Sequence, residues 1–212
     1  MKKQYKLGVI GGGFMAQAIL KGAVYSESVK PKKIIVSDPS REQLDKLKYL
    51  GVNTSVNNRD VAENSEFVLF AVKPQNFPAA AESIHGLPVE NVISIMAGVT
   101  RRKIKENILG RNCRVARAMP NLPCSIGSGM TAVDMSDYAD DVDASAFINS
   151  VFGNLGNVLL VPEEKLNAVT GISGSGPAYV YMFIDGLIKA GMKQGLTEDE
   201  AKTLAVNTVY GG

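Results

Sequence analysis

Short apolar runs alternate with helix-forming segments along most of the chain. Five of these runs are largely apolar, which is typical of strands buried on both faces of a sheet. They cover residues 7–10, 33–37, 67–72, 91–96 and 114–119. Helices are expected at 16–24 and 41–49. This alternation predicts an α/β fold with a Rossmann-type parallel sheet covered by helices on both faces.

The pattern changes near Val161 and Pro162, after which only helices are expected. Residues 178–190 are apolar almost all round, so this helix should be buried on every side, as in a subunit interface. Thr197 and Glu200 have the spacing of a capping box that opens the last helix. We therefore expect a dinucleotide-binding domain over residues 1–161 and an all-helical dimerisation domain, only partly present, over residues 162–212.

A glycine loop follows the first expected strand directly, with the sequence Gly11-Gly12-Gly13-Phe14-Met15-Ala16. The spacing Gly-x-Gly-x-x-Ala between a strand and a helix is the fingerprint of a dinucleotide site. The first glycine permits the tight turn, the second lets the backbone approach a pyrophosphate, and the alanine allows close helix–strand packing. The alternative is a glycine-rich turn without a ligand.

The second expected strand ends at Asp38, where a carboxylate would bind the ribose hydroxyls of NAD. Ser37, Ser40 and Arg41 lie beside it and could instead hold the 2′-phosphate of NADP. These two interpretations conflict, and the sequence leaves both open.

Three further strand ends carry residues suited to a ligand site, namely Lys73-Pro74, Ala97-Gly98 and Pro120-Asn121. Ligands of open parallel sheets bind at the carboxyl ends of the strands. The prolines could equally be strand terminators, and the lysine could be a surface residue.

A second glycine-rich motif, Ser173-Gly174-Ser175-Gly176-Pro177-Ala178-Tyr179, interrupts two apolar segments that otherwise read as helix. Two glycines and a proline disfavour a helix interior, so we expect a shaped loop with Pro177 at the first position of the next helix. The N–H groups ahead of that helix could bind an anion such as a substrate carboxylate. A plain helix-to-helix turn is the alternative.

The charges of this chain argue against nucleic acid as a partner. Its 212 residues are 45% hydrophobic and 21% charged, with a formal net charge of +2. The one basic cluster, Arg101-Arg102-Lys103, is interpreted as a solvated helix start. The five aspartates between Asp134 and Asp143 lack the pattern of a calcium loop and are interpreted as a solvated loop and helix start.

The expected compartment is the cytoplasm. Cys113 and Cys124 are too few for a protein-only zinc site and are expected to be free thiols, so no metal is expected. The basic N-terminus, residues 1–6, precedes an apolar run that stops at the glycines, which excludes a signal peptide. The longest apolar stretch is too short to span a bilayer.

A single histidine, His85, lies away from every expected strand end and is expected at the surface. Dehydrogenases that oxidise an alcohol usually need a base within reach of the reacting atom. The absence of a histidine from the expected site favours reduction of an iminium ion. For that reaction, positioning and charge complementarity can supply most of the catalysis.

These motifs together resemble those of the pyrroline-5-carboxylate reductase family over nearly the whole chain. The glycine loop is similar to the family's cofactor loop, and residues 168–179 are similar to its long signature. Ala71-Val72-Lys73-Pro74, Met96-Ala97-Gly98 and Met119-Pro120-Asn121-Leu122-Pro123 are similar to its cofactor-facing strand ends.

The resemblance implies reduction of 1-pyrroline-5-carboxylate to L-proline, the last step of proline biosynthesis, with NADPH expected and NADH possible. The cofactor-binding residues would be Gly11, Gly12, Gly13, Phe14, Met15, Ala16, Ser37, Asp38, Asn58, Ala71, Val72, Lys73, Pro74, Met96, Ala97, Gly98, Pro120 and Asn121. The substrate would contact Ser173, Gly174, Ser175, Gly176, Pro177 and Asn121. Ser173, Ser175 or Thr170 would orient the imine, and the protein would form homodimers or larger homo-oligomers.

Some residues depart from the family pattern. Asn167 and Lys189 stand where the family usually has acids, and a Ser-Pro-Gly-Gly-Thr-Thr segment that borders the family's substrate is absent before Gly212. We therefore expect a truncated or natively short chain. A non-catalytic dinucleotide-binding paralogue with a regulatory role is the alternative, and a β-hydroxyacid dehydrogenase that uses Lys189 is a third hypothesis.

Overall fold

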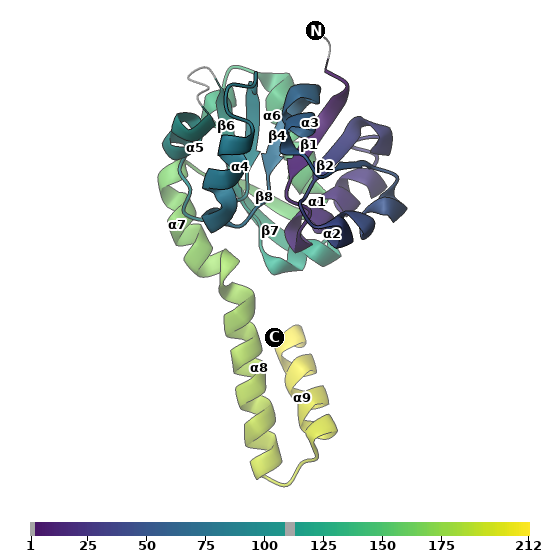
Figure 1. Cartoon of the computed structure of the whole chain (residues 1–212). Helices are drawn as coiled ribbons and strands as arrows, with labels where there is room; N and C mark the ends of the chain where they lie inside the picture. The colour runs from purple at the N-terminus through teal and green to yellow at the C-terminus, as the bar shows by residue number, and fades with distance from the viewer. Residues whose placement is uncertain (1–2, 109–112) are drawn as a thin grey trace.

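A central sheet forms the body of the computed structural model, which describes residues 3–108 and 113–212 (Figure 1). The strands of that described part are β1 (Tyr5–Ile10), β2 (Ile34–Ser37), β3 (Asn53–Ser55), β4 (Ser65–Phe70), β5 (Asn91–Ser94), β6 (Arg114–Met119), β7 (Gly129–Asp134) and β8 (Gly156–Leu160). The five strands expected from the apolar runs are confirmed and differ only in their ends. Met1 and Lys2, part of the basic N-terminus, lie outside the described residues.

The strand order is β3-β2-β1-β4-β5-β6-β7-β8. Strands β1 to β6 pair in parallel, with Leu7 beside Ile34 on β2 and Phe67 on β4. The first six strands have the doubly wound order. Successive strands are added on one side of β1 up to β3 and on its other side from β4 onward, so the switch point lies between β1 and β4. The prediction of a parallel sheet needs one correction, because β7 runs antiparallel to β6 and β8 is parallel to β7.

Helices cover both faces of the sheet and continue beyond it. They are α1 (Phe14–Tyr25), α2 (Arg41–Asp45), α3 (Asn58–Asn64), α4 (Phe77–Ser83), α5 (Arg101–Ile108), α6 (Val142–Gly153), α7 (Leu166–Val169), α8 (Gly176–Lys193) and α9 (Glu198–Gly211). The described helices α1, α2 and α6 pack on one face, and α3, α4 and α5 on the other. Within the described residues, none of the helices has both the length and the hydropathy that a bilayer span needs.

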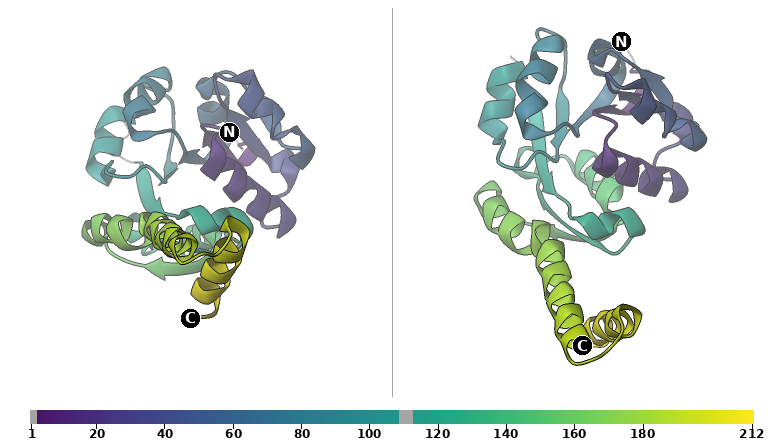
Figure 2. Two further views of the ribbon diagram at one scale, coloured as in Figure 1. Left: turned by 90° about the horizontal axis from the view of Figure 1, so that it is seen from below. Right: turned by 60° about the horizontal axis from the view of Figure 1, so that its bottom comes forward.

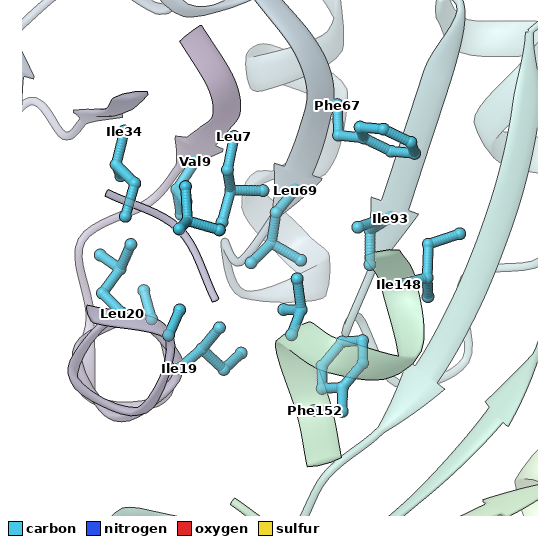
Figure 3. Close-up of a cluster of buried hydrophobic side chains, with 14 of the residues drawn as sticks. Leu7, Val9, Ile19, Leu20, Ile34, Phe67, Leu69, Ile93, Ile148 and Phe152 are labelled. Atoms are coloured by element: carbon cyan, nitrogen blue, oxygen red, sulfur yellow. The ribbon is translucent and has the colours of Figure 1, made fainter. Parts of the chain in front are cut away.

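Alternate residues of the apolar strands supply two cores, one on each face. On the α1 and α6 face, Leu7 and Val9 of β1 meet Ile19 and Leu20 of α1 and Phe152 of α6, all 0% exposed (Figure 3). Burial of each large side chain contributes about 1.5–3 kcal/mol. Because residues 7–10 of β1 are buried on both faces of the sheet, this part of the strand is apolar, which is why the strand could be predicted.

The second glycine motif is not the loop that the sequence predicts. Helix α7, a π-helical turn (Thr170–Gly174) and α8 follow one another with helical backbone at Ser175. The Ser175 N–H donates to the Thr170 carbonyl oxygen, five residues back, at 2.8 Å. Pro177 lies in the first turn of α8 and has no N–H to donate to Ser173. The wider π turn therefore accommodates the glycines and the proline without breaking the helix.

Helices α8 and α9 form a hairpin that stands away from the sheet (Figures 1 and 2). No residue of α8 is buried, and the side chains of Met182 and Phe183 are 73% and 61% exposed. Helix α9 covers part of it, through the buried Ala201 and Ala205. The expected burial of this helix on every side is therefore not met within one chain.

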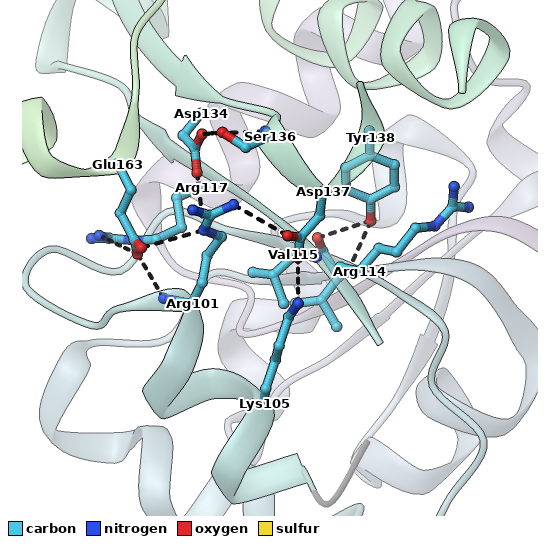
Figure 4. Close-up of polar contacts among 11 residues, drawn as sticks. Arg101, Lys105, Arg114, Val115, Arg117, Asp134, Ser136, Asp137, Tyr138 and Glu163 are labelled. Atoms are coloured by element: carbon cyan, nitrogen blue, oxygen red, sulfur yellow. Dashed lines mark hydrogen bonds and ion pairs between the residues drawn. The ribbon is translucent and has the colours of Figure 1, made fainter. Parts of the chain in front are cut away.

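A cluster of charged side chains connects the helical segment to the sheet (Figure 4). Arg101 at the start of α5 lies 3.2 Å from Asp134, 3.2 Å from Asp137 and 3.3 Å from Glu163. Lys105 pairs with Asp137 at 2.6 Å. The prediction that Arg101 and these aspartates are simply solvated was wrong, because Asp134 is 1% exposed and Arg101 only 24% exposed. Tertiary pairing decides this, and local sequence carries no sign of it.

The chain beside this cluster fits the prediction of a helix start. Arg102 and Asp140 are exposed, and the Asp141 side chain caps α6 by accepting the N–H of Ala144 at 3.0 Å. Part of the aspartate run therefore starts a helix as expected.

Two carboxyls of the cluster titrate below their ordinary range. Burial raises the pKa of Glu163, but hydrogen bonds from the Arg101 N–H and from Arg117 outweigh it and lower that pKa. Burial also raises the pKa of Asp137, and hydrogen bonds from Lys105 and the Val115 N–H more than compensate. Both groups therefore favour the folded state in their ionised form.

Acidification should destabilise the protein through these two carboxyls. A depressed pKa contributes stability that is complete above the unfolded-state value, about 4 for Asp and Glu, and is lost as pH falls through the folded-state value. The urea midpoint should therefore be nearly constant between pH 8 and 6 by this mechanism, and should decline below about pH 4. Asp137→Asn should make that decline shallower; an unchanged slope would contradict this account.

Candidate cofactor and substrate site

The turn after β1 requires glycine at its first position. Gly11 has φ +101°, a left-handed conformation that side chains rarely adopt. A Cβ there would lie 2.9 Å from the backbone of Ala71 at the end of β4. The Gly11 N–H donates to the Ser37 carbonyl oxygen at 2.8 Å, which ties the turn to β2. Gly11 is therefore a requirement of the fold itself.

Gly13 is in a different situation. It is the N-cap of α1 with φ −71°, which any residue can adopt, and a Cβ would meet no protein atom within 4 Å. No side chain caps α1, so its first N–H groups are directed at open space beside Gly13. This cradle fits a dinucleotide pyrophosphate, which needs both the N–H groups and the close backbone approach. Ala16 is 0% exposed and packs tightly in the core.

Asp38 stabilises the glycine loop. Its Oδ2 accepts the Gly12 N–H at 2.8 Å, and its Oδ1 accepts the Ser40 N–H at 2.8 Å. Both carboxylate oxygens thus already have a protein donor. Asp38 lies at the carboxyl end of β2, where a ribose would sit next to the loop.

The Ser37 side chain points into the protein. It is 0% exposed, and its Oγ donates to Asn58 Oδ1 at 2.7 Å. The Asn58 amide in turn donates to Ser83 Oγ at 2.9 Å. Ser37 therefore orients Asn58, and its own hydroxyl is not directed at a ligand.

A cavity of about 300 Å³ opens at the carboxyl ends of β1, β4, β5 and β6. Its lining residues are Gly13, Phe14, Met15, Ala71, Val72, Lys73, Ile95, Met119 and Pro120. Eight of these nine belong to motifs that the sequence singled out. Pro74 begins the turn that follows Lys73.

The end of β5 presents a different side chain from the one expected. Met96 is 2% exposed and packs in the core on the α4 and α5 face, so its side chain does not line the cavity. Ile95 lines it instead, because neighbouring side chains of an extended segment point to opposite sides. Ala97 and Gly98 are exposed beyond it, and neither lines the cavity. The period of two along the strand was the signal that could have identified Ile95.

Asn121 joins this cavity to the signature helix. Its Oδ1 accepts the Met130 N–H at 2.9 Å, and its Nδ2 donates to Ser173 Oγ at 3.4 Å. A Cβ on Gly174 would lie 2.7 Å from Met119 Cε, so the π turn packs directly on a lining residue of the cavity. Ser173 and Gly174 are therefore the signature residues nearest the strand ends.

The polar groups of the remaining signature residues make their contacts within the helical segment. Thr170 Oγ1 donates to the Leu166 carbonyl oxygen at 2.9 Å and is thus engaged within the helix. Ser175, Gly176 and Pro177 are half-buried in the first turn of α8. The Ser175 N–H is engaged by Thr170, so the expected row of free N–H groups for a carboxylate is not formed by a loop here.

Three other residues lie away from the cavity. His85 is exposed after α4, in agreement with the prediction, and Asn167 is exposed on α7. Lys189 pairs with Asp185 on its own helix at 2.6 Å. The hypothesis of a catalytic Lys189 therefore has no support in the geometry.

Comparison with known proteins agrees with this arrangement. Residues 6–98 match the family model described as "NADP oxidoreductase coenzyme F420-dependent". Residues 163–212 match the one described as "Pyrroline-5-carboxylate reductase dimerisation". The fold and the glycine loop thus define an oxidoreductase of the dinucleotide-binding Rossmann class.

Individual relatives narrow the class further. The chain is 40% identical to the pyrroline-5-carboxylate reductase of Synechocystis sp. over 210 residues, covering 97% of this chain and 77% of that one. A pyrroline-5-carboxylate reductase structure from Coxiella burnetii aligns with a TM-score of 0.85 at 32% identity, covering 98% of this chain and 78% of the other. The Plasmodium falciparum enzyme, solved with NADP bound, aligns with a TM-score of 0.85 at 29% identity, covering 100% and 78%. The chain belongs to the pyrroline-5-carboxylate reductase family.

The two loop glycines should respond differently to substitution. Gly13→Val should leave the thermal midpoint nearly unchanged, because a Cβ at this position meets no protein atom within 4 Å, but it should abolish NADPH binding measured by fluorescence. Gly11→Ala should destabilise the fold by about 1–3 kcal/mol, because it combines strain with a backbone clash. Unchanged NADPH affinity in Gly13→Val would overturn the assignment of the cradle.

Proposed function

We propose that this chain catalyses the reduction of 1-pyrroline-5-carboxylate to L-proline with NAD(P)H as the hydride donor. Membership of the reductase family supports this reaction. The observation that carries it is that the signature helix lies against the cavity at the strand ends, with Gly174 packed on Met119 and Ser173 within 3.4 Å of Asn121. A substrate between these elements would face the nicotinamide end of a dinucleotide bound along the glycine loop.

The glycine loop would hold the dinucleotide. The backbone at Gly13 and the uncapped N-terminus of α1 would bind the pyrophosphate, and Asn58 would lie toward the adenosine end. Val72, Pro120 and Ile95 would line the nicotinamide side of the cavity. When bound, the nicotinamide supplies the hydride that adds to C5 of the ring.

The chain's own contribution to the chemistry would be orientation. Ser173 is held by Asn121 as a hydrogen-bond acceptor, so its hydroxyl proton is free to point toward a substrate carboxylate or ring. A protonated C=N bond is already electrophilic, so fixed geometry can supply most of the rate. The Ser175 and Thr170 hydroxyls would be secondary, because Thr170 is already engaged within the helix.

We further propose two domains that meet at residues 161 and 162, since β8 ends at Leu160 and only helices follow. The exposed apolar side chains of α8 would then be covered by a second copy of the chain. The dimerisation model that matches residues 163–212 supports a homodimer.

For the cofactor we propose NADPH, with NADH as a weaker donor. The Asp38 carboxylate accepts two backbone N–H groups, which makes it a support of the loop and offsets part of its charge. Arg41 begins α2 directly after Ser40 and is exposed. A 2′-phosphate beside Asp38 would lie within reach of this guanidinium.

Turnover is the direct test of the proposed reaction. Purified protein should oxidise NADPH when 1-pyrroline-5-carboxylate is added, with proline as the product. Gly174→Val should bind NADPH normally but lose about tenfold or more in turnover, because its side chain displaces Met119 and the π turn. NADPH binding without proline formation would contradict the proposed reaction and favour a non-catalytic paralogue.

Arg41→Ala tests the cofactor preference. It should raise the KM for NADPH about tenfold or more and leave the KM for NADH within about twofold, because only NADPH carries the phosphate. The neighbouring exposed residue offers a matched control in Glu42→Ala. Equal effects on both cofactors would contradict the role of Arg41.

A further inference from the structure

Glu163 occupies the junction between the sheet and the helical segment. It is the first residue of the short 3-10 turn (Glu163–Lys165) that follows β8 and precedes α7. Its Oε1 accepts the Arg101 N–H at 2.7 Å and a hydrogen bond from Arg117 at 3.0 Å. Its Oε2 accepts from Arg101 Nε at 3.3 Å. Glu163 is thus fixed by one backbone group and two guanidinium groups.

The partners of Glu163 lie on elements that also build the cavity. Arg117 is on β6, two residues before Met119, so both side chains belong to the same face of the strand. Arg101 begins α5, which follows the exposed Ala97 and Gly98 after β5. The contacts of Glu163 therefore connect the segment that leads into α7 with β6 and with the start of α5.

Only a short helical stretch separates Glu163 from the substrate side of the site. Leu166 is 2% exposed and anchors α7, which lies against β6 and β7. The π turn then brings Ser173 to Asn121. At 3.4 Å this last hydrogen bond is long, so it is too weak to set the helix position by itself. The Arg117 side chain is 7% exposed, so its ion pair with Glu163 is largely buried. A charge-assisted hydrogen bond of a planar guanidinium also requires a defined orientation of the two groups.

We propose that Glu163 is a positioning residue of the reductase: through Arg101 and Arg117 it holds α7 so that Ser173 lies against Asn121 at the end of β6. This inference rests on the proposed function, because the positioned group is the one that would orient the substrate. Glu163 itself would touch neither substrate nor cofactor.

The neighbouring Glu164 provides a matched control, because it is exposed and lies on the same turn. Glu163→Ala should lower kcat about tenfold and leave the Kd for NADPH within about twofold, since the glycine loop is unaffected. Glu164→Ala should change neither value. Equal loss of NADPH affinity and kcat in Glu163→Ala would overturn the proposal.

Because Glu163→Ala leaves the Arg117 charge without its partner, the double variant Arg117→Met with Glu163→Ala separates folding from positioning. It should recover the thermal midpoint of Arg117→Met alone and still show the loss in kcat. Full recovery of kcat together with stability would mean that Glu163 only neutralises Arg117, and would overturn the proposal.

Hydrogen exchange gives a readout that does not depend on turnover. In Glu163→Ala, amides of residues 166–175 should exchange about tenfold faster, while those of residues 11–17 keep the wild-type rate. If the wild-type chain produces no proline, the proposed reaction fails, yet faster exchange confined to 166–175 would still show that Glu163 holds this segment. Unchanged exchange there would overturn the positioning role by itself.

Discussion

The close approach of the β1 turn to the end of β4 is the constraint on which the site depends. Gly11 lies so near the Ala71 backbone that a Cβ would come within 2.9 Å of it. The Ala71 N–H donates to the Ile10 carbonyl oxygen at 2.9 Å, which holds the two strand ends side by side. From this point the chain leaves β1 and β4 in opposite directions across the sheet, and a cavity opens between the outgoing turns. The glycine loop and the residues that follow β4 are positioned by this contact between the two strand ends.

Ion pairs connect the helical segment to the sheet. Apolar burial fixes how helices pack on the sheet, but it tolerates small displacements of one element against another. Buried ion pairs contribute little net stability, because desolvation offsets their attraction unless the two groups meet in a well-defined geometry. Arg101, Arg117 and Glu163 form such pairs at the edge where α7 leaves the sheet. The proposed substrate side of the site is thereby placed by a polar contact on the opposite end of α7.

Much of the architecture could be predicted because it follows from local pattern. Strands buried on both faces are mostly apolar, so β1, β2, β4, β5 and β6 could be predicted from their apolar runs. The glycine loop was visible for the same kind of reason, since the turn admits few residues at Gly11. Strands β3, β7 and β8 were not predicted, because each lacks a clear apolar run: β3 is made of polar residues, β7 is buried but contains a glycine, a threonine and an aspartate, and β8 is largely exposed. Their place comes from pairing with neighbours distant in sequence.

By itself the sequence determined the class of fold, the dinucleotide loop and the family signature, because each depends on residue types at fixed spacing. The tertiary structure alone decided that the glycine and proline motif is a π turn within a continuous helix. It also decided that Ile95 rather than Met96 faces the cavity, and that Arg101, Asp134 and Asp137 are paired instead of solvated. These outcomes depend on contacts between segments far apart in the chain, whose free energies exceed the local preferences of the residues involved.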